Sequence, residues 1–283
     1  MGLYGAVMMS AEGVPMSLAF YLAPSAGPVD FIALWAVTYA SLLGLYFGFC
    51  GLFHWANTHY PERRIQSRPM KNQIALEIST SVAALASIAA YVAGGLFIQA
   101  KGWALTPLPL TWWSVPLTLA ASLVIYDAWF YWGHRMMHSK VLYRFHAHHH
   151  RSIVPTPWSN NSDTQIGAFV EQSYFLVEPF LLPIPAAVLI IHKIYDQVTG
   201  IAGHAGHEYF ASPSARAPWP LLCTTFHDQH HGHFKCNYAN TFSWWDRMMG
   251  TIHPAYDDLV RKFEGPSPKP EINGNGPPEQ LSG

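Results

Sequence analysis

Long apolar runs separated by short charged loops dominate the first half of the chain. Residues 31–53 carry no charged side chain, residues 74–98 carry only Glu77, and residues 111–132 carry only Asp127. As a helix, the first run would be about 34 Å long, enough to cross the roughly 30 Å hydrocarbon layer of a membrane. Three such runs in close succession predict membrane-spanning helices rather than buried helices of a soluble core.

The charged loops predict how these helices are oriented. The loop between the first two runs carries Arg63, Arg64, Arg68 and Lys71, whereas the next loop carries only Lys101. Because cytoplasmic loops are enriched in Lys and Arg, we expect the first loop to be cytoplasmic and the N-terminus to lie outside. The third run then returns to the cytoplasmic face.

Composition agrees with a membrane protein and excludes several other classes. Only 12% of residues are charged, against roughly 25% in a typical soluble domain. The formal net charge of −1 gives no electrostatic case for nucleic acid binding. The three cysteines lack a CxxC spacing, which disfavours a disulfide framework or a thiolate zinc site. We expect residues 1–264 to form one membrane-integrated domain and the Pro- and Gly-rich residues 265–283 to be a disordered tail.

Histidine is the residue type that points to chemistry. Twelve of the sixteen histidines lie in residues 134–150 and 204–233. They form four motifs: His134-Arg-Met-Met-His138, His146-Ala-His-His149-His150, His204-Ala-Gly-His207 and His227-Asp-Gln-His230-His231.

The spacing of these motifs suits metal binding by helices. Residues three or four apart share a helical face, so their imidazoles can converge on one ion. The two adjacent histidines at the end of each H-x-x-H-H box diverge by about 100°, so each can serve a different ion. The two boxes and the H-x-x-x-H pair supply eight nitrogen ligands, and His204 and His207 raise the number of candidates to ten. This number suits two metal ions and exceeds what one needs.

A fourth apolar region, residues 174–195, must connect the early and late histidines. It contains Glu178 and three prolines, Pro179, Pro183 and Pro185. A single straight span would put the last box on the opposite side of the membrane from the first two. Since proline interrupts helices, we expect a broken hairpin that enters and leaves on one side.

The histidine motifs and their flanking residues resemble the fatty acid hydroxylase/sterol desaturase superfamily of membrane non-haem di-iron proteins. The resemblance covers roughly residues 110–255. It rests on Asp127-Ala-Trp-Phe-Tyr-Trp-Gly-His134-Arg-Met-Met-His138, on Tyr143-Arg-Phe-His146-Ala-His-His149-His150, on Phe226-His227-Asp-Gln-His230-His231 with Asn237-Tyr238, and on Trp245-Asp246-Arg-Met-Met-Gly250-Thr251.

The resemblance implies an all-α fold, in which helical membrane spans carry a cytosolic helical cap that holds the di-metal site. The positions that match the family's ligands are His134, His138, His146, His149, His150, His204, His227, His230 and His231, with His207 as a further candidate. The His-Pro-x-Glu element of many sterol-acting members is missing after the second box, whereas Pro155-Thr156-Pro157 is similar to C-5 sterol desaturases.

The function implied is O₂-dependent hydroxylation or desaturation of a sterol or fatty-acyl lipid by two iron ions, which zinc can replace in purified protein. The chain shows no flavin, haem or iron–sulfur motif, so electrons must come from an external donor of the ferredoxin, rubredoxin or cytochrome b5 type. Asp127, Asp228 and Asn237 are candidate catalytic residues that support the ligands. Asp127 lies two helical turns before His134 and could accept a hydrogen bond from an imidazole; alternatively, it only reaches the membrane surface.

Two other classes of protein compete with this interpretation. A membrane metal transporter, or a metal sensor with a histidine-rich cytosolic site, would also need many imidazoles. Transporters place their ligands midway through the membrane, whereas these histidines follow the predicted spans. A membrane metalloprotease is disfavoured because the His-Glu-x-x-His signature is absent.

Overall fold

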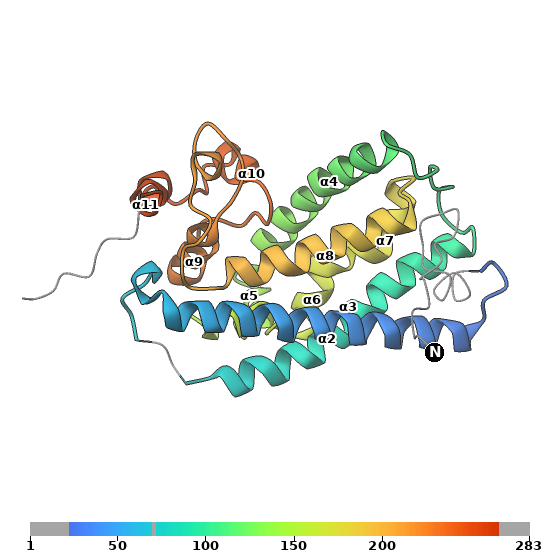
Figure 1. The fold of residues 1–283 in the computed structure, drawn as a ribbon, viewed down its shortest axis with the longest axis horizontal. Coiled ribbons are helices and arrows are strands. Elements are labelled where there is room, and N and C mark those ends of the chain that lie inside the picture. The colour runs from blue at the N-terminus through green and yellow to red at the C-terminus, as the bar shows by residue number, and fades with distance from the viewer. Residues whose placement is uncertain (1–22, 70–71, 266–283) are drawn as a thin grey trace, which may run out of the picture.

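The protein is a bundle of long helices with smaller helices gathered at one end (Figure 1). The computed structural model describes residues 23–69 and 72–265; parts of the predicted domain and nearly all of the predicted tail lie outside these residues. Over the described ranges the chain is helical and forms no sheet, which confirms the all-α prediction. The α-helices are α2 (Pro28–His59), α3 (Ile74–Ala100), α4 (Ser114–Met137), α5 (Tyr143–His146), α6 (Gln165–Gln172), α7 (Tyr174–Leu181), α8 (Ala186–Gly203), α9 (Thr224–His233), α10 (Trp244–Met248) and α11 (Tyr256–Phe263).

The three predicted spans correspond to α2, α3 and α4, which have 32, 27 and 24 residues and are long and apolar enough to cross a membrane. Each helix is longer than its apolar run. α2 starts at Pro28, where proline suits the first helical turn, and the side chain of Asp30 accepts a hydrogen bond from the Gly27 amide. α4 continues past its apolar run to Met137 and therefore carries His134 in its last turn.

The fourth apolar region reverses direction between α7 and α8. α7 ends at Leu181, residues 182–185 are extended or irregular, and α8 then runs back toward α9 (Figure 1). Pro179 lies inside α7, so the break falls at Pro183 and Pro185. The amides of Leu105 and Leu108 donate to the carbonyls of Pro179 and Pro183, so these two carbonyls at the break have hydrogen-bond partners. α8 extends to Gly203, eight residues beyond the predicted region, and is not among the helices apolar enough to span.

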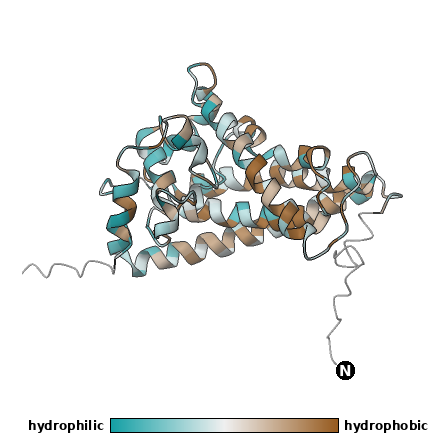
Figure 2. Cartoon of the chain, turned by 90° about the horizontal axis from the view of Figure 1, so that it is seen from above, coloured by the Kyte–Doolittle hydropathy of each residue, from teal (hydrophilic) through white to brown (hydrophobic). Residues whose placement is uncertain are grey.

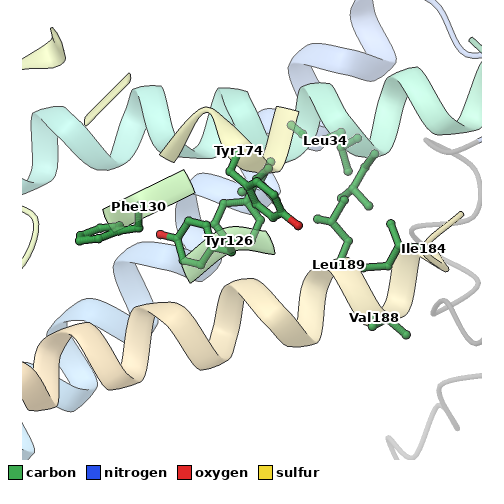
Figure 3. Packing of buried hydrophobic residues seen from close by; sticks show 11 residues of the cluster. Leu34, Tyr126, Phe130, Tyr174, Ile184, Val188 and Leu189 are labelled. Carbon is green, nitrogen blue, oxygen red and sulfur yellow. The ribbon is translucent and has the colours of Figure 1, made fainter. Parts of the chain in front are cut away.

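Aromatic and branched side chains fill the middle of the bundle. Tyr126 and Phe130 of α4 pack with Tyr174 of α7 and with Val188 and Leu189 of α8 (Figure 3). Within a membrane such side chains stabilise the bundle through van der Waals packing, because lipid tails are as apolar as the core itself. The backbones of α3 and α7 pack closely at Gly95. A Cβ atom at this position would lie only 2.1 Å from the carbonyl oxygen of Phe175, so only glycine fits.

Polar residues are concentrated at one end of the long axis. Apolar helices fill one half of the molecule, and the other half is largely hydrophilic (Figure 2). At this polar end α9, α10 and α11 form a cap with its own small core, which includes Phe226, Tyr238, Tyr256 and Val260. The C-terminal ends of α2, α4 and α8 meet the cap here (Figure 1). All histidines of the four motifs lie on or next to these helix ends.

Candidate metal centre

Nine of the ten candidate imidazoles converge between α4, the segment that follows it, the end of α8, and α9. They form two groups, and within each group one nitrogen from every ring lies within 4.8 Å of the others. The five-histidine group contains His134, His138, His146, His150 and His230. The four-histidine group contains His149, His204, His227 and His231.

The two H-x-x-H-H boxes each contribute to both groups. In the second motif His146 and His150 join the five-histidine group, whereas His149 joins the other. In α9, His230 joins the five-histidine group, and His227 and His231 join the four-histidine group. This division is the one expected when adjacent positions on a helix diverge by about 100° and positions four apart share a face.

Backbone carbonyls fix the orientation of most of these rings. In five of them the Nδ1 atom donates to a carbonyl oxygen: His134 to Tyr238 (2.9 Å), His149 to Ser162 (3.3 Å), His204 to Gly200 (2.8 Å), His230 to Cys236 (2.7 Å) and His231 to Ser152 (2.9 Å). Because a carbonyl oxygen can only accept, Nδ1 must carry the proton in each of these rings. The Nε2 atom then presents a lone pair toward the centre of its group.

These lone pairs face one another at short distances. The Nε2 atom of His204 lies 3.2 Å from that of His149 and 3.3 Å from that of His231. Two acceptors at such distances repel each other unless a cation lies between them. Nitrogen ligands about 2.0–2.1 Å from a metal, at angles of roughly 90–110°, would be about 2.8–3.4 Å apart. The residues therefore fit a bound divalent cation.

Burial keeps the imidazoles neutral, as ligands must be. It lowers the pKa of His138, His146 and His204 to about 3 and that of His149 to about 4. In His138, His149 and His204, repulsion between neighbouring rings adds to the effect of burial. Burial, followed by the same repulsion, lowers the pKa of His150, His227, His230 and His231 well below the usual value.

A carboxylate that the sequence did not reveal orients His146. The Oδ2 atom of Asp163 lies 3.2 Å from Nδ1 of His146. Gly167 makes room for this carboxylate, because a Cβ atom there would lie 2.0 Å from Asp163 Oδ2. Asp163 and His146 are separated by an irregular loop, so no helical spacing links them in the sequence.

Two further buried carboxylates, Glu208 and Glu77, support the backbone around the site. Glu208 accepts hydrogen bonds from the amide (2.7 Å) and hydroxyl (2.5 Å) of Thr225. It thereby satisfies the N-terminal end of α9, which carries three of the ligands. Glu77 of α3 accepts from the hydroxyl of Ser152 (2.6 Å), whose carbonyl holds His231. Glu208 directly follows the third histidine motif, but no spacing along the chain links it to Thr225.

The expected hydrogen bond from a ligand imidazole to Asp127 is not formed. The Oδ1 atom of Asp127 instead accepts from three successive backbone amides, those of Asn240 (3.2 Å), Thr241 (2.8 Å) and Phe242 (3.1 Å). The cap loop, residues 234–243 between α9 and α10, folds back over α4 and brings these amides to the carboxylate. Asp127 thus positions the cap loop and has no direct contact with the ligands, and it is buried rather than at a membrane surface.

Asn237 and Asp228 also lie beside the ligands without touching their rings. Asn237 adopts a left-handed backbone conformation (φ 58°), donates to the carbonyl of Phe226 (2.8 Å), and accepts from the amide of His253 (2.7 Å). It therefore anchors the start of α9 to the cap. Asp228 is buried, which raises its pKa to about 7, and among the described residues no imidazole donates to its carboxylate.

His207 lies outside both groups. It follows Gly206, whose left-handed backbone (φ 69°) turns the chain away from the centre, and it pairs with Arg64 in an isolated β-bridge. Its ring lies parallel to that of Tyr209 instead. The proximity of His207 to His204 in the sequence was therefore misleading, because the intervening turn separates their side chains.

A cavity of about 300 Å³ reaches both groups. His134 of the five-histidine group lines it, as do His149, His204 and His227 of the four-histidine group. Residues of α4, α6, α8, α9 and the cap loop supply the rest of its walls. A small molecule in this cavity would lie directly against the imidazoles.

Three apolar helices of membrane-spanning length and buried histidine groups able to bind metal at one end are typical of membrane metalloproteins. The family described as "Fatty acid hydroxylase" matches residues 119–251, which include every ligand candidate. The human lathosterol oxidase is 27% identical over 262 residues, which cover 88% of this chain and 84% of the relative. The mouse lathosterol oxidase is 26% identical over 260 residues, with the same coverage.

A Delta(7)-sterol 5(6)-desaturase from Aspergillus fumigatus is 26% identical over 212 residues, which cover 71% of this chain and 60% of the relative. No solved structure matches the chain. Both comparisons bear out the resemblance to the fatty acid hydroxylase/sterol desaturase superfamily that the histidine motifs indicated.

Proposed function

We propose that the protein is an O₂-dependent oxidoreductase that hydroxylates or desaturates a sterol-type lipid, with two iron ions held by nine histidines. The observation that carries the proposal is the convergence of Nε2 atoms in both groups, which a bound cation in each group would stabilise. Each group would hold one ion, the first with five imidazoles and the second with four. When bound, iron supplies the redox chemistry with dioxygen that no side chain of this protein can supply.

The protein's own residues hold, orient and shield the centre. The carbonyl oxygens that fix Nδ1 set the tautomer of each ring, and burial keeps the imidazoles uncharged between turnovers. Asp163 fixes the orientation of the His146 ring, as backbone carbonyls do for five of the other rings. Phe130 and Phe226 line the cavity beside the imidazoles and limit the access of water.

The sterol assignment rests on the relatives and on one sequence feature. The relatives described above are named for lathosterol and for Delta(7)-sterols. The Pro155-Thr156-Pro157 element, which is similar to C-5 sterol desaturases, also favours a sterol substrate. The absence of the His-Pro-x-Glu element distinguishes this chain from many sterol-acting members, so a fatty-acyl lipid is the alternative substrate.

The positive loop residues favour a cytoplasmic location for the centre. Arg63 and Arg64 lie at the same end of the bundle as the histidines, where the amide of Glu208 donates to the carbonyl of Arg63. We propose that three helices cross the membrane and that α7 and α8 form a re-entrant hairpin. A ferredoxin, rubredoxin or cytochrome b5-like donor would dock at the cytoplasmic face. A transporter is disfavoured because both histidine groups lie at one end of the bundle rather than midway.

Iron-loaded full-length protein in lipid nanodiscs tests the proposal. We expect about two ions per chain by elemental analysis, and with lathosterol, dioxygen and a reduced donor, a product that is heavier by one oxygen or lighter by two hydrogens. His149→Ala should lose turnover and retain about one ion, while the protein stays in the membrane. His59→Ala, which removes an exposed histidine from the end of α2, is the matched control. Full turnover by His149→Ala, or a single tightly bound ion in the wild type, would contradict the proposal.

A further inference from the structure

The cavity beside the histidines is lined by both apolar and polar side chains. Apolar surface comes from Phe53, Val198, Phe210, Leu221, Leu222 and Phe226. The polar side chains, together called the polar wall, include Asp163, Glu171, Gln172, Asp196, Asn240 and Thr241. Three carboxyl groups in a cavity for a lipid require an explanation, because each buried polar group is costly unless it is paired.

Most of this polar wall is already paired. Asp196 accepts from the hydroxyl of Tyr126 (2.9 Å) and from Lys193 (2.6 Å). Gln172 binds the same two side chains. Asp163 is held by His146 and by the amide of Thr164 (2.7 Å). These groups form the wall itself and have little capacity left for a ligand.

Glu171 and Thr241 are the exceptions. Among the described residues, none forms a hydrogen bond with the Glu171 carboxylate, whose nearest basic atom is Nδ1 of His146 at 3.9 Å. The side chain of Glu171 is 16% exposed. Thr241 is 5% exposed, and its hydroxyl also has no partner in the described part of the chain. The Thr241 hydroxyl is buried, and since more than about 90% of buried polar groups are paired, a ligand in the cavity is its expected partner. The Glu171 carboxylate is partly exposed and also lines the cavity, so it is available to the same ligand.

We propose that Glu171 and Thr241 bind a hydroxyl group of the lipid substrate, which is oxidised at a carbon only a few bonds away from that hydroxyl. This inference rests on the proposed function and adds the position of oxidation to it. Glu171 lies beside His146, and the cavity that it lines is bounded by four of the ligand imidazoles. A lipid held by its polar group at Glu171 therefore presents its polar end, rather than the middle of its tail, to the centre.

The charge of the polar wall selects a hydroxyl over other head groups. Among the described residues that line the cavity, none is Lys or Arg, so a carboxylate or phosphate group would find no cation to pair with. A hydroxyl has a proton that Glu171 can accept and lone pairs to which Thr241 can donate.

The test uses iron-loaded full-length protein in nanodiscs with a matched pair of lipids, lathosterol and its 3-O-methyl ether. For the wild type we expect a KM about tenfold higher for the ether, because the ether cannot donate a hydrogen bond. Glu171→Ala should raise the KM for lathosterol about tenfold and remove the difference between the two lipids. Glu171→Gln should have an intermediate KM, and Thr241→Val should raise the KM several-fold. The metal content of all three variants should equal that of the wild type.

Glu62→Ala, which removes an exposed carboxylate near the end of α2, is the matched control and should behave as the wild type. Equal KM values for both lipids in the wild type, or an unchanged KM in Glu171→Ala, would overturn the inference while leaving the oxidase function intact. A loss of bound metal in Glu171→Ala would overturn it as well, since Glu171 would then support the centre rather than the substrate. A metal-loaded wild type that converts neither lipid would contradict the proposed function and the inference with it.

Discussion

The two histidine groups differ in how they are anchored and in what they face. Three of the four rings in the four-histidine group are fixed by backbone carbonyls. In the five-histidine group two rings are fixed in this way, a third is held by Asp163, and His138 is only half-buried. The cavity touches three members of the four-histidine group but only one member of the five-histidine group.

This difference indicates a division of labour between the groups. The four-histidine group has fewer protein nitrogens and supplies three of the four imidazoles that line the cavity, so it is the group that faces a bound substrate. The five-histidine group lies among α4, α5 and α9 beside Asp163, and it borders the cavity only through His134. We therefore expect substitutions in the two groups to have unequal effects.

The largest expected effect is on turnover, when one ligand is removed from each group in turn. His204→Ala should abolish turnover and leave about one ion per chain. His138→Ala, at the half-buried edge of the five-histidine group, should also cost an ion but reduce turnover less. Turnover assays combined with elemental analysis distinguish the two variants. A greater loss of turnover in His138→Ala would show that the wrong group has been assigned to the cavity.

Acid should destabilise both groups, and the sign follows from the histidine pKa values. The folded-state pKa of His146 and His204 is about 3 and that of His149 about 4, whereas in an unfolded chain each is about 6.5. The unfolded state therefore binds more protons below pH 6.5, so stability is lost as the pH falls from 6.5 toward 4. Each histidine contributes a loss of about 1.4 kcal/mol per pH unit in this window.

Thermal unfolding of metal-free protein between pH 8 and pH 4.5 measures this loss. The unfolding temperature should be nearly constant down to about pH 6.5 and should then fall steeply. His204→Ala should reduce the slope of stability against pH by about the contribution of one histidine. A flat profile down to pH 5 would show that these rings are not buried in the neutral form.

The smallest expected effect concerns the carboxylate that distinguishes the five-histidine group. Asp163→Ala removes the partner of His146 and should weaken metal binding by that group about 10–100-fold. The four-histidine group should retain its affinity. Competition with a chelator, read by elemental analysis, measures both affinities, and Asp258→Ala at an exposed position is the matched control. Equal weakening of both groups would indicate that Asp163 acts on the fold of the whole centre.

Much of the architecture could be predicted from the sequence. The apolar runs located α2, α3 and α4, because a span must be long and nearly free of charge wherever it lies in the fold. The prolines of residues 174–195 indicated a reversal, although they could not distinguish Pro179, which lies within α7, from Pro183 and Pro185, which end it. The helical spacing of the histidine boxes indicated that adjacent histidines would separate into two groups.

Residues joined by irregular loops were harder to predict. Asp127 lies two helical turns before His134, but its carboxylate accepts hydrogen bonds from three backbone amides of the cap loop instead of from an imidazole. His207 follows His204 closely, but the turn at Gly206 directs it elsewhere. Asp163, Glu208 and Glu77 were missed because their partners lie in other elements, and no spacing along the chain records such contacts.

The sequence alone determined which residues could bind metal and that they belong to a helical protein of the membrane type. Local periodicity and hydrophobicity fix these properties, because they depend only on neighbours within a few turns of helix. The tertiary structure decided which imidazoles share a group, which carbonyls fix their tautomers, and that Glu171 and Thr241 face the cavity without hydrogen-bond partners among the described residues. Those properties depend on distances between separate helices and loops, which only the packing of the whole bundle sets.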